Sequence, residues 1–161
     1  MRRTTLFSLA LALAPLAAQA GPDLATKRVL SLGAAKQVAA AAEGAAARSG
    51  SGGAIAVVDD GGHVLVLERL DGTFPAAPEI AAGKARSAAT FRKPTADFEK
   101  AIAGGRTSLL ANPPLLPLQG GVPIVVEGQV VGAVGVAGAS SADADDAIAR
   151  EAAGALAAPA R

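Results

Sequence analysis

The 161-residue sequence carries fifteen Lys and Arg against fourteen Asp and Glu, a single His and no Cys. The absence of Cys excludes disulfides, thiol catalysis and cysteine-ligated metal sites. The chain has neither the basic surplus nor the RNP-like aromatic motif that nucleic-acid binding uses, so we expect no nucleic-acid partner. Its length suits one domain with a single core, and that core must be aliphatic because only 2% of the residues are aromatic.

The first twenty residues have the three parts of a cleavable secretion signal. Two arginines supply a positive start, an uncharged apolar run follows, and Ala18-Gln19-Ala20 is the small-x-small pattern that a signal peptidase accepts. The apolar run is shorter than the ~20 residues that span a bilayer, which argues against a membrane anchor. We therefore predict that residues 1–20 are a signal peptide and residues 21–161 the mature domain. This domain is expected to be periplasmic or secreted, with no membrane span after cleavage.

Hydrophobic spacing and glycine positions predict the element order helix, hairpin, two helices, hairpin, helix. Ser31 and Ser140 are the predicted N-caps of the first and last helices. Residues 104–121 are predicted to be a long Gly/Pro/Leu loop, of a kind that is often functional or flexible. The predicted helices cover residues 32–48, 79–91, 95–103 and 142–156, and the predicted strands residues 54–59, 63–70, 122–126 and 129–136.

Two hairpins can join into one antiparallel sheet, and the βαβ alternation of a doubly wound parallel sheet is missing. Both faces of the predicted strand 54–59 are apolar, so helices or another subunit must cover the sheet on both sides. Gly132 and Gly135 mark a close approach by a helix, a ligand or another backbone. We therefore predict an α+β domain. The few aromatic residues leave little to cover both sheet faces, so a homo-oligomer is expected.

The only histidine, His63, opens the second predicted strand, next to Asp59-Asp60-Gly61-Gly62. One His without any Cys cannot build a multi-His zinc site, but it can be an axial ligand to haem iron or a general base. The alternative is a turn histidine that is satisfied by solvent or backbone. Short motifs of this kind have a high false-positive rate, so the sequence alone favours the turn histidine over a ligand or base.

Lys84 emerges from an otherwise apolar stripe of the predicted helix 79–91, while Arg69 and Asp71 flank the end of the strand before it. A lysine in such a place can bind a carboxylate or a haem propionate. An ion pair with Asp71 or Glu68 at an oligomer interface would explain it equally well. Three aspartates in the first turns of the last helix are better explained by the helix dipole than by a metal cluster.

Six short segments match, in order, a pattern found in one protein family. They are Val57–His63, Arg69–Gly72, Lys84–Phe91, Pro94–Thr95, Gly120–Ile124 and Gly132–Ala139. These segments resemble the GlcG/HbpS-like family, which includes the C-terminal domain of PduO-type proteins. The resemblance extends from about Leu30 to Ala153, and the ordered set is more specific than any single segment. One departure is Ala137, where a Ser is common in the family, so any role of that hydroxyl is absent here.

The resemblance implies a profilin-like fold, with an antiparallel sheet of about five strands flanked by helices, and assembly into dimers or larger oligomers. Some exported members of this family bind haem and are linked to haem sensing, iron chemistry and protection from oxidative stress, while others are associated with glycolate or diol metabolism without a settled activity. The resemblance thus implies haem or another small molecule as the ligand, and a sensor or transporter as a partner. His63 is the candidate metal ligand, with Thr95 as an alternative, and Arg69, Asp71 and Lys84 are the candidate cofactor-binding residues around it.

Two other function classes stay open from the sequence. One is an enzyme or accessory protein that acts on a small organic acid or a corrinoid-type cofactor, with Lys84, Arg69 and Asp71 around its pocket. The other is an oligomeric scaffold without a ligand. The scarcity of acid and base residues favours binding over catalysis. The sequence therefore predicts an exported haem-binding protein with a role in haem or iron handling or sensing.

Overall fold

The computed structural model describes residues 24–156. Within them, two hairpins form one antiparallel sheet with the strand order β2-β1-β4-β3. The elements are α1 (Leu32–Arg48), β1 (Ala54–Asp59), β2 (Val64–Arg69), α2 (Ala77–Phe91), α3 (Thr95–Ala103), η1 (Thr107–Ala111), β3 (Gly121–Val126), β4 (Gln129–Ala137), α4 (Ala142–Ala153) and η2 (Gly154–Leu156). The predicted signal peptide and its cleavage point before Gly21 lie outside the described residues.

The predicted α+β class and element order are confirmed, but the sheet has four strands where the resemblance implies about five. The two hairpins supply all four strands. The segments that could have added another strand do not pair with the sheet, since residues 24–31 lead into α1 without strand pairing and residues 107–111 form the 3₁₀-helix η1. The difference therefore lies at the sheet margin and leaves the architecture unchanged.

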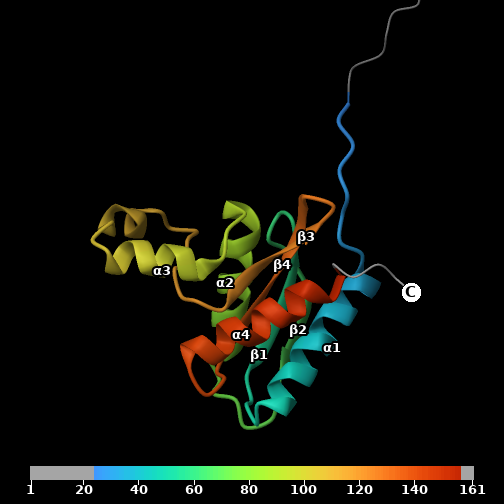
Figure 1. Ribbon diagram of the computed structural model, residues 1–161, viewed down its shortest axis with the longest axis vertical. Coiled ribbons are helices and arrows are strands. Elements are labelled where there is room, and N and C mark those ends of the chain that lie inside the picture. The colour runs from blue at the N-terminus through green and yellow to red at the C-terminus, as the bar shows by residue number, and fades with distance from the viewer. Residues whose placement is uncertain (1–23, 157–161) are drawn as a thin grey trace, which may run out of the picture.

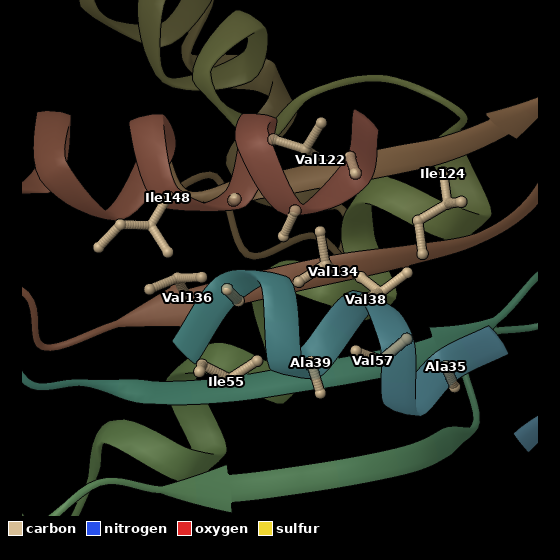
Figure 2. Close-up of a cluster of buried hydrophobic side chains, with 14 of the residues drawn as sticks. Ala35, Val38, Ala39, Ile55, Val57, Val122, Ile124, Val134, Val136 and Ile148 are labelled. Atoms are coloured by element: carbon tan, nitrogen blue, oxygen red, sulfur yellow. The ribbon is translucent and has the colours of Figure 1, made fainter. Parts of the chain in front are cut away.

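Helices of this chain cover both faces of the sheet (Figure 1). On one face α1 and α4 pack side by side, and Val38 and Ile148 meet the strand residues Ile55, Val57 and Val134 in the larger core (Figure 2). On the other face α2 packs on the strands through an alanine-rich layer. The central strand β1 is thus buried on both sides within a single chain. Its two apolar faces therefore do not require another subunit, and the homo-oligomer stays a prediction.

Glycines in β4 permit this close packing. A Cβ at Gly135 would lie 2.1 Å from the carbonyl oxygen of Ala81 on α2, and a Cβ at Gly132 would lie 2.3 Å from the carbonyl oxygen of Val58 on β1. Real Cβ atoms do not approach backbone oxygens so closely. The close approach predicted at these two glycines is confirmed, with a helix at the first and a neighbouring strand at the second.

The helix ends agree with the sequence in most places. The side chain of Ser31 caps α1 by accepting the backbone N–H of Ala34, as predicted. At α4 the prediction is wrong by one residue: Ser141, not Ser140, is extended and accepts the N–H of Ala144 at 3.1 Å. The helix α2 begins two residues earlier than predicted, because Pro78 lies in its first turn, where a missing N–H costs no hydrogen bond.

One part of the fold projects beyond the sheet. We call α3 with η1 the arm; Figure 1 shows it extending sideways from the end of α2. The arm is joined to the sheet at its base, where the Oγ1 of Thr95 accepts the backbone N–H of Gly121 at 2.9 Å. No helix within residues 24–156 is long and apolar enough to span a membrane.

Candidate functional site

His63 lies in the β1–β2 turn with its side chain 82% exposed. Its Nδ1 is 3.3 Å from the Oδ1 of Asp59, and the same oxygen accepts the backbone N–H groups of Gly61 and His63 at 2.9 Å each. Partial burial acts to raise the pKa of Asp59, but these two N–H groups and the neighbouring imidazole outweigh it, so the pKa lies below its ordinary value. The ionised carboxylate therefore holds the turn and orients the imidazole ring.

A polar cavity of about 290 Å³ lies at the same end of the sheet, between the lead-in to α1, the β1–β2 turn and the β3–β4 turn. We call it the hairpin-end cavity. Its charged lining residues are Lys27, Arg28, Arg92 and Asp60. Lys27 donates to Asp60 at 2.8 Å, and Arg28 forms an ion pair with Glu127. Arg92 forms no ion pair with another residue in the range 24–156, so its guanidinium is the lining group best able to hold an anionic group.

An apolar cavity of about 290 Å³ adjoins it and shares Arg28 in its wall. The other residues that line this cavity are Val29, Leu30, Ser31, Ala34, Val126, Val131 and Leu156. The two neighbouring cavities thus combine an apolar wall with a cationic one. This combination suits a ligand that has an apolar body and acidic groups.

Lys84 has a structural partner in the core, and it is neither of the two predicted carboxylates. The lysine is 3% exposed, and its Nζ donates to the Oδ2 of Asp145 and to the carbonyl of Val136, both at 2.8 Å. The predicted pair with Asp71 or Glu68 is therefore wrong: the side chain passes the start of β3 to reach α4 instead of turning toward β2. Asp145 lies in the first turn of α4, as predicted, and also accepts the N–H of Ala139 at 2.9 Å, so its carboxylate is held by the buried pair in addition to its place at the helix start.

The five residues singled out from the sequence fall into three places. Lys84 and Thr95 come together, since a Cβ at Gly121 would touch the backbone of the first and the side chain of the second. Arg69 and Asp71 lie exposed at the far end of β2, the edge strand opposite β3. His63 lies at the other end of β2. In one copy of the chain they therefore do not line a common pocket.

The cationic residues of the hairpin-end cavity were not recognisable from the sequence as a group. Lys27 and Arg28 belong to the segment before the first helix, which has no periodicity to predict its position. Arg92 is the C-cap of α2 and has the left-handed conformation, with φ of 55°, which the sequence does not reveal. The adjacent basic pair Arg92-Lys93 at a helix end was the one signal available.

The side chains that could ligate a metal limit which kind of metal centre the region around His63 could hold. Among residues 24–156 there is no group of three or more His, Cys, Asp or Glu that could hold a metal ion. The single exposed imidazole has its Nδ1 beside a carboxylate, and its Nε2 has no partner in this part of the chain. A ligating histidine commonly has its second nitrogen hydrogen-bonded in this way. The Nε2 of His63 is thus available as a single axial ligand, which is what a metal held in its own macrocycle takes from a protein.

The fold and the site define a small α+β domain with an antiparallel sheet between helical layers and a polar cavity at its hairpin end. Residues 30–154 match the family model described as "Haem degrading protein HbpS-like". The chain belongs to this HbpS-like family, as its motifs indicate.

Individual relatives support the assignment. Protein GlcG of Escherichia coli is 45% identical over 111 residues, which cover 69% of this chain and 83% of the relative. The crystal structure of a double mutant of HbpS from Streptomyces reticuli is 39% identical, with a TM-score of 0.78, and the match covers 91% of this chain and 99% of that one. A crystal structure of a PduOC–haem complex has a TM-score of 0.72 at 22% identity, covering 80% of this chain and 96% of that one, and shows the shared fold.

Proposed function

We propose that this protein binds haem outside the cytoplasm. The observation that carries the proposal is the match of nearly all of the described domain to a family model whose description names haem. The 39% identity to HbpS extends over most of the chain, so the likeness is not confined to the core. Whether this chain can hold haem then depends on the residues at the hairpin end of the sheet.

His63 is the residue proposed to ligate the iron. Its imidazole is exposed, and the contact between Nδ1 and Asp59 leaves Nε2 as the ligating atom. Asp59 would act as a positioning residue, because a carboxylate on the second ring nitrogen fixes the orientation of the ring. Bound haem would supply the iron and its ligand-binding and redox chemistry.

The propionate groups of haem need cationic partners, and the hairpin-end cavity offers them. Arg92 and Lys27 line it, and Asp60, three residues before His63, lies in the same wall. Charge-assisted hydrogen bonds from Arg and Lys are the usual means of holding carboxylates. These residues replace Lys84 in that role in our proposal, because the ammonium group of Lys84 is buried between Asp145 and the carbonyl of Val136, whereas Lys27 is exposed. The neighbouring apolar cavity supplies surface for the macrocycle.

The export part of the proposal rests on the N-terminal sequence alone. A positive start, an uncharged apolar run and Ala18-Gln19-Ala20 support a cleaved signal peptide. Haem handling outside the cytoplasm is consistent with a domain that has no Cys and therefore no thiol to oxidise.

A haem titration of the mature domain, residues 21–161, tests the proposal. We expect a saturable shift of the Soret band in the wild type. The variant His63→Ala should bind haem at least ~10-fold more weakly and with an altered Soret position, since an axial bond is lost. Arg92→Gln should weaken binding and keep the position of the band. Lys36→Gln, on the exposed side of α1, is the matched control for charge. A wild type without any Soret shift would leave the ligand-free scaffold as the better interpretation.

A further inference from the structure

A further cavity, larger than the two at the hairpin end, lies in the arm, away from His63. Its volume is about 350 Å³, and it opens between the C-terminal end of α2, α3 and η1. We call it the arm cavity. Figure 1 shows the arm beside the sheet, and the residues that line the cavity come from the arm, from the end of α2 and from the links between these elements. Its lining residues are Phe91, Lys93, Asp97, Phe98, Ala101, Arg106 and Leu109.

Aromatic side chains gather here although the chain has few of them. The sequence has no Trp and no Tyr, and two of the three phenylalanines within residues 24–156 line this cavity. The rings of Phe91 and Phe98 meet edge to face, with centroids 5.5 Å apart and an angle of 68° between their planes. An aromatic ligand can extend such a pair, because an edge or a face of each ring is available to a third ring.

Charged side chains at the rim of the cavity have no ion-pair partner within the described part of the chain. Lys93 and Arg106 are exposed, and neither forms an ion pair with another residue in the range 24–156. The same holds for Asp97, on the first turn of α3. Two cations beside an aromatic wall are complementary to a carboxylate on an aromatic ring. The carboxylate of Asp97 can accept a hydrogen bond from a hydroxyl or amine group that the same ligand carries.

We propose that the arm cavity binds a small aromatic carboxylate. Phe91, Phe98 and Leu109 contact the ring, and Lys93 and Arg106 hold the acid group. The volume is near the lower end of the range of about 300–1,000 Å³ that small-molecule sites occupy, which suits a ligand of one or two fused rings. The arm cavity shares no lining residue with the hairpin-end cavity or with the apolar cavity beside it. The site is therefore separate from the proposed haem site, and neither proposal depends on the other.

The absence of Trp and Tyr makes a direct measurement possible. The intrinsic fluorescence of the protein is confined to Phe, so the emission of 2-naphthoate can be followed in titrations without interference. We expect saturable binding to the wild-type mature domain. Cyclohexanecarboxylate, which has the charge without the aromatic ring, and 2-naphthalenemethanol, which has the rings without the charge, should each bind more weakly.

Variants locate the binding in the arm. Lys93→Gln and Arg106→Gln should each weaken naphthoate binding by roughly 3- to 10-fold, the usual effect of losing one charged hydrogen-bond partner at an exposed rim. Phe98→Leu keeps an apolar side chain but removes the aromatic ring, so it should also weaken naphthoate binding. The matched controls are Phe74→Leu and Lys100→Gln, which change the same residue types outside the cavity lining, and His63→Ala, which alters the proposed haem site.

Far-UV circular dichroism checks that each variant is folded, and the two rim variants are exposed substitutions that leave the packing intact. Binding that is equal for the three ligands, or that is unchanged in Lys93→Gln, Arg106→Gln and Phe98→Leu, overturns the proposal. So does the absence of naphthoate binding to the wild type at millimolar concentration. Retained binding in His63→Ala, together with loss in the arm variants, supports it whatever the outcome of the haem titration.

Discussion

Lys84 on α2 donates a 2.8 Å hydrogen bond to Asp145 on α4, although these helices lie on opposite faces of the sheet. The lysine reaches past the point where β3 begins. There Gly120, with φ of 109°, leaves room for it: a Cβ at this position would lie 3.0 Å from Nζ and 2.9 Å from the Cβ of Asp145. A third contact, to the carbonyl of Val136, ties the ammonium to β4. The pair thus joins both helical layers to the sheet.

Removal of either charge should destabilise the fold strongly. Asp145→Asn leaves an ammonium group in the core without its counter-charge, and Lys84→Met leaves a buried carboxylate with one N–H donor. Each single substitution should lower the free energy of unfolding by about 3–5 kcal/mol, as is usual when one partner of a buried pair is lost. Urea unfolding followed by circular dichroism measures this.

The double variant Lys84→Met with Asp145→Leu separates charge burial from packing. If the cost in the single variants comes from an unpaired buried charge, the double variant should be markedly more stable than the sum of the two single effects implies. Additive losses would contradict this account. Asp143→Asn, at an exposed position of the same helix, is the control and should change the stability little.

Gly135 should tolerate no side chain. Its added Cβ would lie 2.1 Å from the carbonyl oxygen of Ala81 and 2.7 Å from the backbone nitrogen of Ala85, so α2 would have to move off the sheet. We expect Gly135→Ala to cost at least about 1–3 kcal/mol, the usual penalty of overpacking. Gly154→Ala, where no atom lies within 4 Å of the added Cβ, is the matched control. Thermal unfolding of both variants against the wild type makes the comparison, and an equal effect would rule out the steric explanation.

Local signals in the sequence predict most of the fold. The cap at Ser31 and the 3.6-residue spacing give the bounds of α1, and Asp60-Gly61-Gly62 gives the first hairpin. The cap at α4 was missed because two adjacent serines, Ser140 and Ser141, are equally good caps and only the backbone conformation separates them.

The candidate sites depend on contacts that have no local signal. Lys84 and Asp145 are 61 residues apart, and their pairing requires the strand order that puts the start of β3 next to the end of β4. The hairpin-end cavity likewise combines the lead-in to α1 with two turns. Only His63 and Asp59, four residues apart, are recognisable as neighbours from the sequence. The structure adds that the imidazole ring is exposed.

The contribution of Asp59 to stability should depend on pH. Its pKa in the folded protein lies below the ordinary value of 3.8, so the ionised form is favoured by folding. The stabilisation is therefore complete above pH 3.8 and is lost as the pH falls through the lower folded-state pKa. Urea unfolding of the wild type and Asp59→Ala at neutral pH and through an acidic series should show a difference that shrinks at the acidic end. A difference that stays constant would mean that the carboxylate charge is not responsible.

Processing of the N-terminus is open to direct measurement. The small residues Ala18 and Ala20 predict that signal peptidase cuts before Gly21. Protein expressed from the full sequence and recovered from the cell envelope or the medium should begin at Gly21 by N-terminal sequencing. Ala20→Asp, which puts a charge next to the cut, should leave the precursor uncleaved. An intact Met1 on soluble wild-type protein would contradict the prediction.

Self-association should involve the edge strand β2. This strand pairs only with β1, so one row of its backbone N–H and C=O groups is open to another chain. Val64 and Leu67 are 44% and 46% exposed on the strand, which adds apolar surface to the open edge. We expect the wild-type mature domain to be an oligomer by light scattering at micromolar concentration and Leu67→Lys to shift it toward the monomer. Leu110→Lys, at an exposed leucine of η1, is the control and should leave the assembly unchanged. A monomeric wild type would exclude this edge as an interface, and an effect of Leu110→Lys alone would move the interface to the arm.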